Sequence, residues 1–167
     1  MCIRDSVNAG DESVLVHNTS CEPFAGRPRG LTFSGADGGP GTWTEIGRGD
    51  SGLDYQFEIT GGPQRSDVNT GTRFVTEYEV NGTNFDGWDR DRGVLLDSKD
   101  WNNFPADLEN PPEFLITEEL RIARQQVQAA NGTPIEWVMP NAERAEFWLD
   151  VLESAEPEIL GISVRLS

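Results

Sequence analysis

The alternation of apolar and polar residues predicts β-strands along the middle of the chain. Residues 55–59, YQFEI, alternate in this way before the turn TGGP, which predicts a half-buried strand. Residues 73–80 and 83–88 flank an Asn-Gly pair, which tolerates the positive φ angles of a type I′ turn, so we expect them to form a hairpin. Residues 94–99 begin with the apolar run VLL and predict a third, central strand.

The pattern changes to a helical period after a loop rich in Pro and Asn. A helix is predicted from an N-cap at Thr117 to Ala130, because apolar residues recur along it at helical spacing. A strand at residues 135–139, a second helix capped by Asn141 and a closing strand at residues 159–166 follow. This order predicts an α/β (α+β) fold in which helices flank a mixed central sheet.

The first third of the chain has a different texture. The stretch at residues 21–52 is rich in Gly and Pro and predicts a loose lead-in, and the run VLV before His17 predicts a short strand. We therefore expect one compact domain at residues 53–167, preceded by this lead-in and by a separate segment at residues 1–20.

Composition narrows the class of protein. Hydrophobic residues make up 36% of the 167 residues, which is enough for one core. No apolar run approaches the about 20 residues of a membrane span, and the start of the chain lacks the apolar region of a signal peptide, so no membrane insertion is expected. The only histidine, His17, precedes the domain, and neither Cys2 nor Cys21 has metal-ligand spacing. These facts exclude His-based zinc chemistry and a Ser-His-Asp triad in the domain.

Three charged side chains are predicted to converge at one sheet edge. Asp86 lies near the end of one predicted strand, and Asp97 and Lys99 lie two apart in the next, so the latter two share a face. Two carboxylates can hold a hard cation such as Mg²⁺, and an ammonium group beside them can stabilise charge on a phosphate. Lys99 is the only lysine of the 13 basic residues. The alternative is that these are ordinary solvated residues, since 29 residues of the chain are acidic.

The net charge of −16 argues against tight, non-specific binding of nucleic acid, which depends on neutralising phosphates. Three circumstances would reconcile this charge with catalysis on a nucleic acid. In the first, bound metal ions would supply positive charge, and in the second, the acidity would be an adaptation to salt. In the third, local arginines would gather at the site, namely Arg90, Arg92, Arg121 and Arg124.

The motifs YQ, ITG, FDG and LLDSK, followed by a helix with RQQ and by PIEWVM, resemble the fifth group of restriction-endonuclease-like toxin domains of bacterial polymorphic toxins. That group belongs to the PD-(D/E)XK nuclease superfamily. The resemblance implies a restriction-endonuclease-like core in which Asp86 and Asp97 bind Mg²⁺ or Mn²⁺ and Lys99 is the superfamily lysine. It also implies site roles for Gln56 and for Gln125 or its neighbour Gln126. Relatives often have glutamate at position 97, so the aspartate here is a departure.

A second resemblance lies upstream. The stretch VLVHNTSC resembles the end of a pretoxin Hint (intein-like) domain, in which an asparagine attacks its own carbonyl group and a neighbouring histidine donates a proton. His17, Asn18 and Thr19 would hold those positions. Because the body of such a domain is absent from this sequence, we expect these residues to mark a junction and not to cleave the chain.

Together these patterns predict a Mg²⁺-dependent endonuclease toxin domain of a secreted effector, acting in the cytoplasm of a competitor cell. The expected substrate is nucleic acid, with DNA favoured over RNA, and the expected partner is a cognate immunity protein. The rivals are a non-catalytic acidic domain that binds a protein partner, and a metal-dependent hydrolase of another substrate.

Overall fold

The computed structural model describes residues 6–9, 12–15, 38–48, 52–101, 104–155, 159 and 161–167. Its main sheet has four strands, which lie in the order β10 (Ile162–Leu166), β9 (Ile135–Met139), β8 (Val94–Ser98) and β7 (Gly87–Asp89). The strands β8, β9 and β10 are parallel and β7 is antiparallel to β8, so the sheet is mixed.

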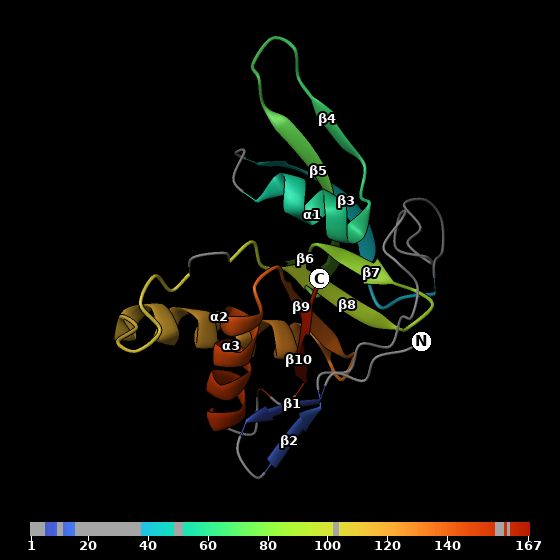
Figure 1. The fold of residues 1–167 in the computed structure, drawn as a ribbon. Helices are drawn as coiled ribbons and strands as arrows, with labels where there is room; N and C mark the ends of the chain where they lie inside the picture. Colours follow the sequence, from blue (N-terminus) through green and yellow to red (C-terminus); the bar gives the residue numbers. More distant parts are fainter. Residues whose placement is uncertain are drawn as a thin grey trace.

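A second, antiparallel sheet stands beside the first (Figure 1). It consists of β3 (Thr42–Arg48), β5 (Arg73–Val80) and β4 (Gln64–Ser66), with β6 (Thr83–Phe85) paired to the far end of β5. A separate antiparallel pair near the N-terminus is formed by β1 (Ser6–Ala9) and β2 (Glu12–Leu15).

Helices cover both faces of the main sheet. Since alternate residues of a strand point to opposite faces, each face packs against its own helices and has its own core cluster. On one face, α2 (Glu113–Ala130) and α3 (Ala142–Ser154) contribute to a large core cluster that includes Leu95, Trp137, Ala123 and Trp148. On the other face, α1 (Leu53–Thr60) contributes to a smaller cluster of Tyr55, Ile59, Leu96 and Val138. The predicted mixed sheet flanked by helices is confirmed.

The strand predicted at residues 55–59 is wrong, since this stretch belongs to the helix α1. Leu53, Gln56 and Ile59 recur every third residue and are all buried. Gly52 and Gly61 flank the helix with φ angles of 77° and 62°, a backbone conformation that glycine adopts without a steric penalty. The eight-residue stretch fits both periods, and packing against β8 decides between them.

The predicted hairpin is confirmed, but its second strand is divided. Asn81 and Gly82 have φ angles of 49° and 79°, as a type I′ turn requires. After Phe85 the chain leaves β5, and from Gly87 it pairs with β8 instead. Asp86 is therefore the residue at which the chain passes from the second sheet to the main sheet.

The remaining boundaries follow the predictions closely, with two corrections. The helix α2 begins at Glu113 after Pro112 and has no side-chain cap, so the predicted N-cap at Thr117 is wrong. The predicted lead-in contains a seven-residue strand, β3, held by β5. The cap of α3 is confirmed, because Asn141 Oδ1 accepts a hydrogen bond from the backbone N–H of Arg144 at 3.1 Å. Within the described residues, no helix is long and apolar enough to cross a membrane.

Candidate active site

The passage between the two sheets brings Asp86 to the carboxyl end of β8. The backbone N–H of Ser98 donates a hydrogen bond to Asp86 Oδ2 at 2.6 Å, and the Ser98 hydroxyl donates to the same oxygen. These two bonds fix the Asp86 carboxylate against the last residue of β8. The structure thus brings Asp86 to the strand that carries Asp97, as the sequence predicted.

Asp97 is 8% exposed and is held from the α2 side of the sheet. Gln126 Nε2 donates a hydrogen bond to Asp97 Oδ2. The indole N–H of Trp137 donates to Gln126 Oε1 at 2.8 Å, which fixes the orientation of the Gln126 amide. A chain of buried polar contacts therefore runs from β9 through α2 to Asp97.

Lys99 lies directly after β8, with its backbone N–H bonded to the carbonyl oxygen of Val138 at 2.8 Å. Its Nζ atom is 2.9 Å from Asp97 Oδ2 and 3.9 Å from Glu119 Oε2. The same atom lies 5.0 Å and 4.7 Å from the ring centroids of Trp101 and Trp137, within the range of cation–π attraction. Two carboxylates and two indoles thus enclose the only lysine of the chain.

The two aspartates repel each other in a site with little access to water. Burial raises the pKa of Asp86 to about 7, and the charge of Asp97 adds to the rise against the opposing hydrogen bonds from Ser98. A carboxyl group with this pKa is partly protonated at neutral pH until a cation compensates its charge.

The charge of Lys99 is retained despite its burial. Burial alone lowers the pKa of Lys99, but the charges of Asp97 and Glu119 and the hydrogen bond to Asp97 outweigh it, so the pKa lies above its ordinary value. Lys99 is therefore an ammonium ion at neutral pH, which makes it a hydrogen-bond donor and not a base.

The pKa of Asp86 predicts a specific pH dependence of stability. Without metal, the folded protein keeps the Asp86 proton up to about pH 7, whereas the unfolded chain loses it near pH 4. The free energy of unfolding therefore falls as pH rises through this window. We expect Asp86→Asn to stabilise the metal-free protein by roughly 1–4 kcal/mol at pH 8 and to have no such effect at pH 4.

Denaturant unfolding in chelator at both pH values measures this difference. The control is Asp150→Asn, which removes an exposed aspartate on α3. An equal effect of Asp86→Asn at pH 4 and pH 8 would contradict the electrostatic explanation.

The two glutamines of α2 have different surroundings. Gln126 is buried against Asp97 and Trp137, whereas Gln125 is exposed and accepts a hydrogen bond from Arg121 at 3.3 Å. The expectation that Gln125 contributes to the site is therefore corrected in favour of Gln126. The spacing of Glu119, Ala123 and Gln126 places all three on one helix face. Because Ala123 is apolar, it indicates from the sequence alone that this face is buried, and so could have identified Gln126 and Glu119.

Gln126 and Gln125 form a matched pair for mutation. We expect Gln126→Ala to lower the free energy of unfolding by about 2–3 kcal/mol, because it leaves the buried Trp137 N–H without its acceptor and removes one hydrogen-bond donor from Asp97, which still contacts Lys99. We expect Gln125→Ala to change it by less than about 0.5 kcal/mol. Urea unfolding of both variants checks this, and equal effects would show that the Gln126 contacts contribute nothing.

The other residues predicted from the sequence are placed as follows. Gln56 is buried on α1, on the opposite face of the sheet from α2. His17, Asn18 and Thr19 lie outside the described residues, as do Cys2 and Cys21. Glu119, whose Oε2 atom lies 3.9 Å from Lys99 Nζ, is a neighbour of this cluster that the sequence patterns did not identify.

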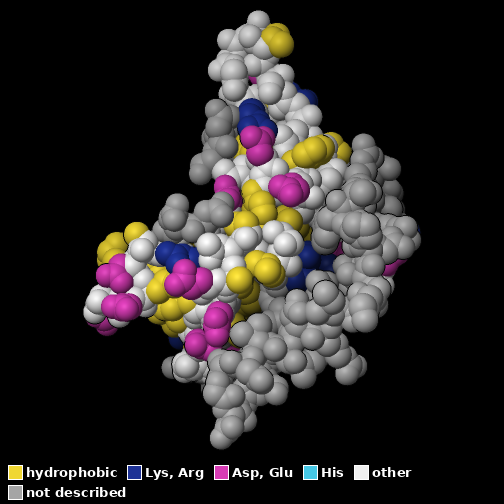
Figure 2. Space-filling view, viewed as in Figure 1, with side chains coloured by type: hydrophobic (Ala, Val, Ile, Leu, Met, Phe, Trp, Pro, Cys, Tyr) yellow, Lys and Arg dark blue, Asp and Glu magenta, His cyan; other side chains and the backbone are white. Residues whose placement is uncertain are grey.

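The arginines proposed to gather at the site have partners of their own. Arg92 is paired with Asp89 at 2.6 Å and with the buried Glu136 at 2.8 Å. Arg121 is paired with Glu118 at 2.7 Å on the exposed face of α2. These two arginines therefore balance nearby acids, and Figure 2 shows further acidic side chains spread over α2 and α3.

The donor set of the site fits a hard divalent cation. In the part of the chain that the structure describes, no three His, Cys, Asp or Glu side chains are arranged to hold a metal ion. Mg²⁺, however, is commonly bound by only one or two carboxylates, with waters and substrate phosphates completing its shell. Asp86 and Asp97 would provide two such carboxylates. Burial, and after it the charge of Asp97, raises the pKa of Asp86, so a bound cation would stabilise the ionised form of this carboxyl group.

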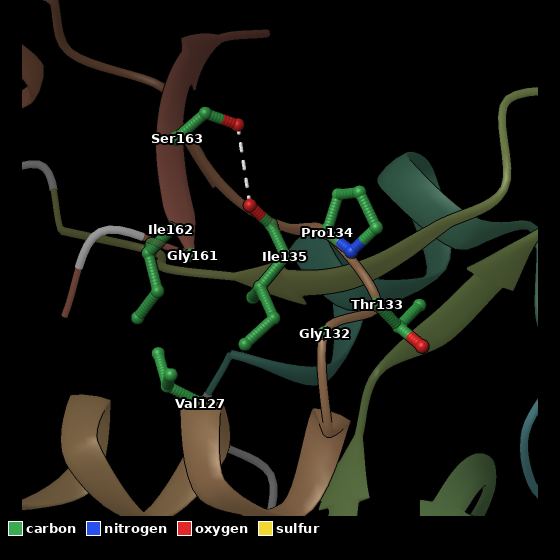
Figure 3. A pocket seen from close by; sticks show the side chains of 8 residues that line it. All are labelled: Val127, Gly132, Thr133, Pro134, Ile135, Gly161, Ile162 and Ser163. Carbon is green, nitrogen blue, oxygen red and sulfur yellow. Dashed lines mark hydrogen bonds between the residues drawn. The ribbon is translucent and has the colours of Figure 1, made fainter. Parts of the chain in front are cut away.

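A pocket of about 400 Å³ lies at the other end of the parallel strands (Figure 3). Its lining lacks charged side chains and consists of Val127, Gly132, Thr133, Pro134, Ile135, Gly161, Ile162 and Ser163. Ser163 Oγ is occupied by a hydrogen bond to the carbonyl oxygen of Ile135 at 3.2 Å. This pocket lacks the groups for phosphate chemistry, so the cluster at the end of β8 remains the candidate active site.

Comparison with known proteins gives one match. A family model described as restriction endonuclease fold toxin 5 matches residues 52–141, which is more than half of the chain. No curated protein and no solved structure matches. The matched range contains Asp86, Asp97, Lys99 and the whole of α2, whereas the stretch that resembles a Hint domain lies outside it.

Proposed function

Because the chain belongs to the restriction endonuclease fold toxin 5 family, we propose that its compact domain is a metal-dependent nuclease that hydrolyses phosphodiester bonds of DNA, or alternatively of RNA. The observation that carries this proposal is the meeting of Asp86 and Asp97 beside a charged, enclosed Lys99 at the end of β8. A fold alone hosts many activities, so the argument depends on this cluster and not on the fold.

In this proposal Asp86 and Asp97 hold Mg²⁺ or Mn²⁺. When bound, such an ion supplies positive charge to the phosphate and lowers the pKa of a coordinated water molecule. Ser98 and Gln126 orient the two carboxylates through the hydrogen bonds that they donate. These bonds keep each carboxylate in place before a cation arrives, which reduces the reorganisation that binding requires.

Lys99 acts as a donor in the proposed reaction. Its ammonium group is kept charged by its carboxylate neighbours, and enclosure by Trp101 and Trp137 limits its exposure to water. A positive group in such a site stabilises the charge that develops on the phosphate oxygens during attack by water. Trp101 also packs against Trp148, so we assign it to the core and not to base stacking.

The wider role follows from the family. We propose that the domain is delivered as part of a secreted effector and acts in the cytoplasm of a competitor cell, and that the producing cell makes an immunity protein. A net charge of −16 would attract a basic immunity protein to the acidic surface of the chain. His17, Asn18 and Thr19 would mark the junction with an upstream Hint-type segment.

A cleavage assay tests the proposed activity. The purified full chain is incubated with supercoiled plasmid DNA and with total RNA, at low and high salt, in Mg²⁺, in Mn²⁺ and in chelator. We expect cleavage of DNA that requires a divalent ion and stops in chelator. A folded protein that cleaves neither substrate under any of these conditions would overturn the proposal.

The net charge favours a second candidate, a non-catalytic domain whose acidic surface binds a protein. That function does not require the buried Lys99 to be charged. It predicts that substitution of Lys99 leaves partner binding and toxicity unchanged, whereas the nuclease function predicts loss of toxicity.

A further inference from the structure

The ammonium group of Lys99 has two carboxylate neighbours, which are not equivalent. Asp97 Oδ2 is 2.9 Å from Lys99 Nζ and accepts a hydrogen bond from Gln126 as well. Glu119 Oε2 is 3.9 Å from the same nitrogen, beyond hydrogen-bond distance. The observed state therefore pairs Lys99 with Asp97 and leaves Glu119 at a longer distance.

Glu119 Oε2 is buried and has no hydrogen-bond partner. A buried carboxylate oxygen without a donor is uncommon and unfavourable, so its position calls for an explanation. The nearest cation is Lys99, which lies about one ångström outside bonding range of this oxygen. A small movement of the lysine side chain would let Lys99 Nζ donate a hydrogen bond to Glu119 Oε2.

A cation on Asp97 would provide the cause of that movement. An ammonium group 2.9 Å from an oxygen that also ligates a divalent ion is repelled by the ion. Lys99 then needs another carboxylate to remain both buried and charged. Lys99 Nζ forms ion pairs with Asp97 on β8 and with Glu119 on α2, and the charge of Asp86 adds a weaker attraction. Glu119 is the member of this group that we do not assign to the metal.

We propose that Glu119 is a positioning residue that receives the Lys99 ammonium group from Asp97 when a divalent cation binds. This inference rests on the proposed function of the site, since it assumes a cation at Asp86 and Asp97. It gives Glu119 the role of keeping Lys99 beside the site in the metal-loaded state. Without Glu119, Lys99 would stay on Asp97 and compete with the cation for the carboxylate.

The test uses the fact that Lys99 is the only lysine of the chain. The full chain, labelled with ¹³C,¹⁵N-lysine, gives one set of lysine side-chain signals in an NMR spectrum. These signals are followed during titration with Mg²⁺ in the wild type, Glu119→Gln and Glu119→Asp. The matched control is Glu118→Gln, which removes an exposed carboxylate one residue away that pairs with Arg121.

We expect Mg²⁺ to shift the Lys99 side-chain signals of the wild type and of Glu118→Gln. In Glu119→Gln we expect this shift to be lost and Mg²⁺ to bind about 10-fold more weakly. Glu119→Asp keeps the charge and should restore most of both effects. Identical Mg²⁺-induced shifts in Glu119→Gln and the wild type would overturn the proposal, and so would lysine signals that ignore Mg²⁺ in the wild type.

These outcomes do not depend on cleavage. A protein that shows the Glu119-dependent shift but cuts no nucleic acid would support the inference and overturn the proposed function. A protein that cuts nucleic acid but lacks the Glu119-dependent shift would support the proposed function and overturn the inference.

Discussion

Replacing Lys99 by methionine is expected to lower the rate of metal-dependent cleavage by about 100- to 1,000-fold or more. Methionine keeps much of the length and apolar contact of the lysine side chain, which lies against Trp101 and Trp137, but removes the charge. The loss is expected in kcat, because in the proposed reaction the ammonium group stabilises charge that develops only in the transition state. Single-turnover cleavage at saturating Mg²⁺ measures it.

The same substitution is expected to tighten the binding of Mg²⁺. Lys99 occupies Asp97 Oδ2 at 2.9 Å and so competes with a cation for that oxygen. A variant that binds Mg²⁺ at least as well as the wild type, but cleaves far more slowly, would separate the catalytic role of Lys99 from a structural one. Lys99→Arg is the control for charge alone. It keeps a positive charge, but its planar guanidinium group does not reproduce the position of the lysine nitrogen. Unchanged kcat in the methionine variant would exclude a catalytic role.

Asp97→Asn is expected to have the second large effect, on both metal binding and rate. Substitution of a group that only orients a metal ligand typically lowers metal affinity about 10- to 100-fold, and loss of a ligand should exceed this. The new amide is close in size to the carboxylate and can still accept the hydrogen bond from Gln126, whose own orientation is fixed by Trp137. Calorimetric titration with Mn²⁺ measures the affinity, and cleavage assays measure the rate.

Asp89→Asn is the matched control for that experiment. Asp89 is also a buried aspartate, 5% exposed, but it pairs with Arg92 at the other end of β7. We expect this control to lower stability without changing the affinity for Mn²⁺. Equal losses of affinity in the two variants would contradict the assignment of Asp97 as a ligand.

The parts of the fold that the sequence predicted depend on local chemistry. The Asn-Gly turn at residues 81–82 requires positive φ angles that few other pairs tolerate, and the cap of α3 needs only the side chain of Asn141. The apolar run VLL before Asp97 predicted a central strand, and these residues begin the mostly buried strand β8. In these cases one short stretch contains the whole physical cause.

The predictions were wrong where contacts between residues far apart in the sequence determine the secondary structure. Residues 53–60 satisfy both a strand period and a helix period, and the choice depends on packing against Leu96 and Val138, which are far away in sequence. The stretch 83–88 was predicted as one strand, yet its pairing partner changes at Asp86, because its first half pairs with β5 and its second half pairs with β8.

The site was predicted in part for the same reason. Asp86, Asp97 and Lys99 follow from strand spacing, but the orientation of α2 about its axis depends on how it packs on the sheet. The buried Ala123 and Ala130 are three and four residues from Gln126, which places Gln126 and not Gln125 on the sheet-facing side. Glu119 lies four residues before Ala123, and its relation to Lys99 emerges only in three dimensions.

The location of a bound metal ion tests the central claim most directly. A crystal of the full chain grown with Mn²⁺ locates the ion by its anomalous scattering. The account predicts one ion with a carboxylate oxygen from both Asp86 and Asp97 within about 2.3 Å. Mn²⁺ bound only at other residues, in a protein that cleaves nucleic acid, would contradict it.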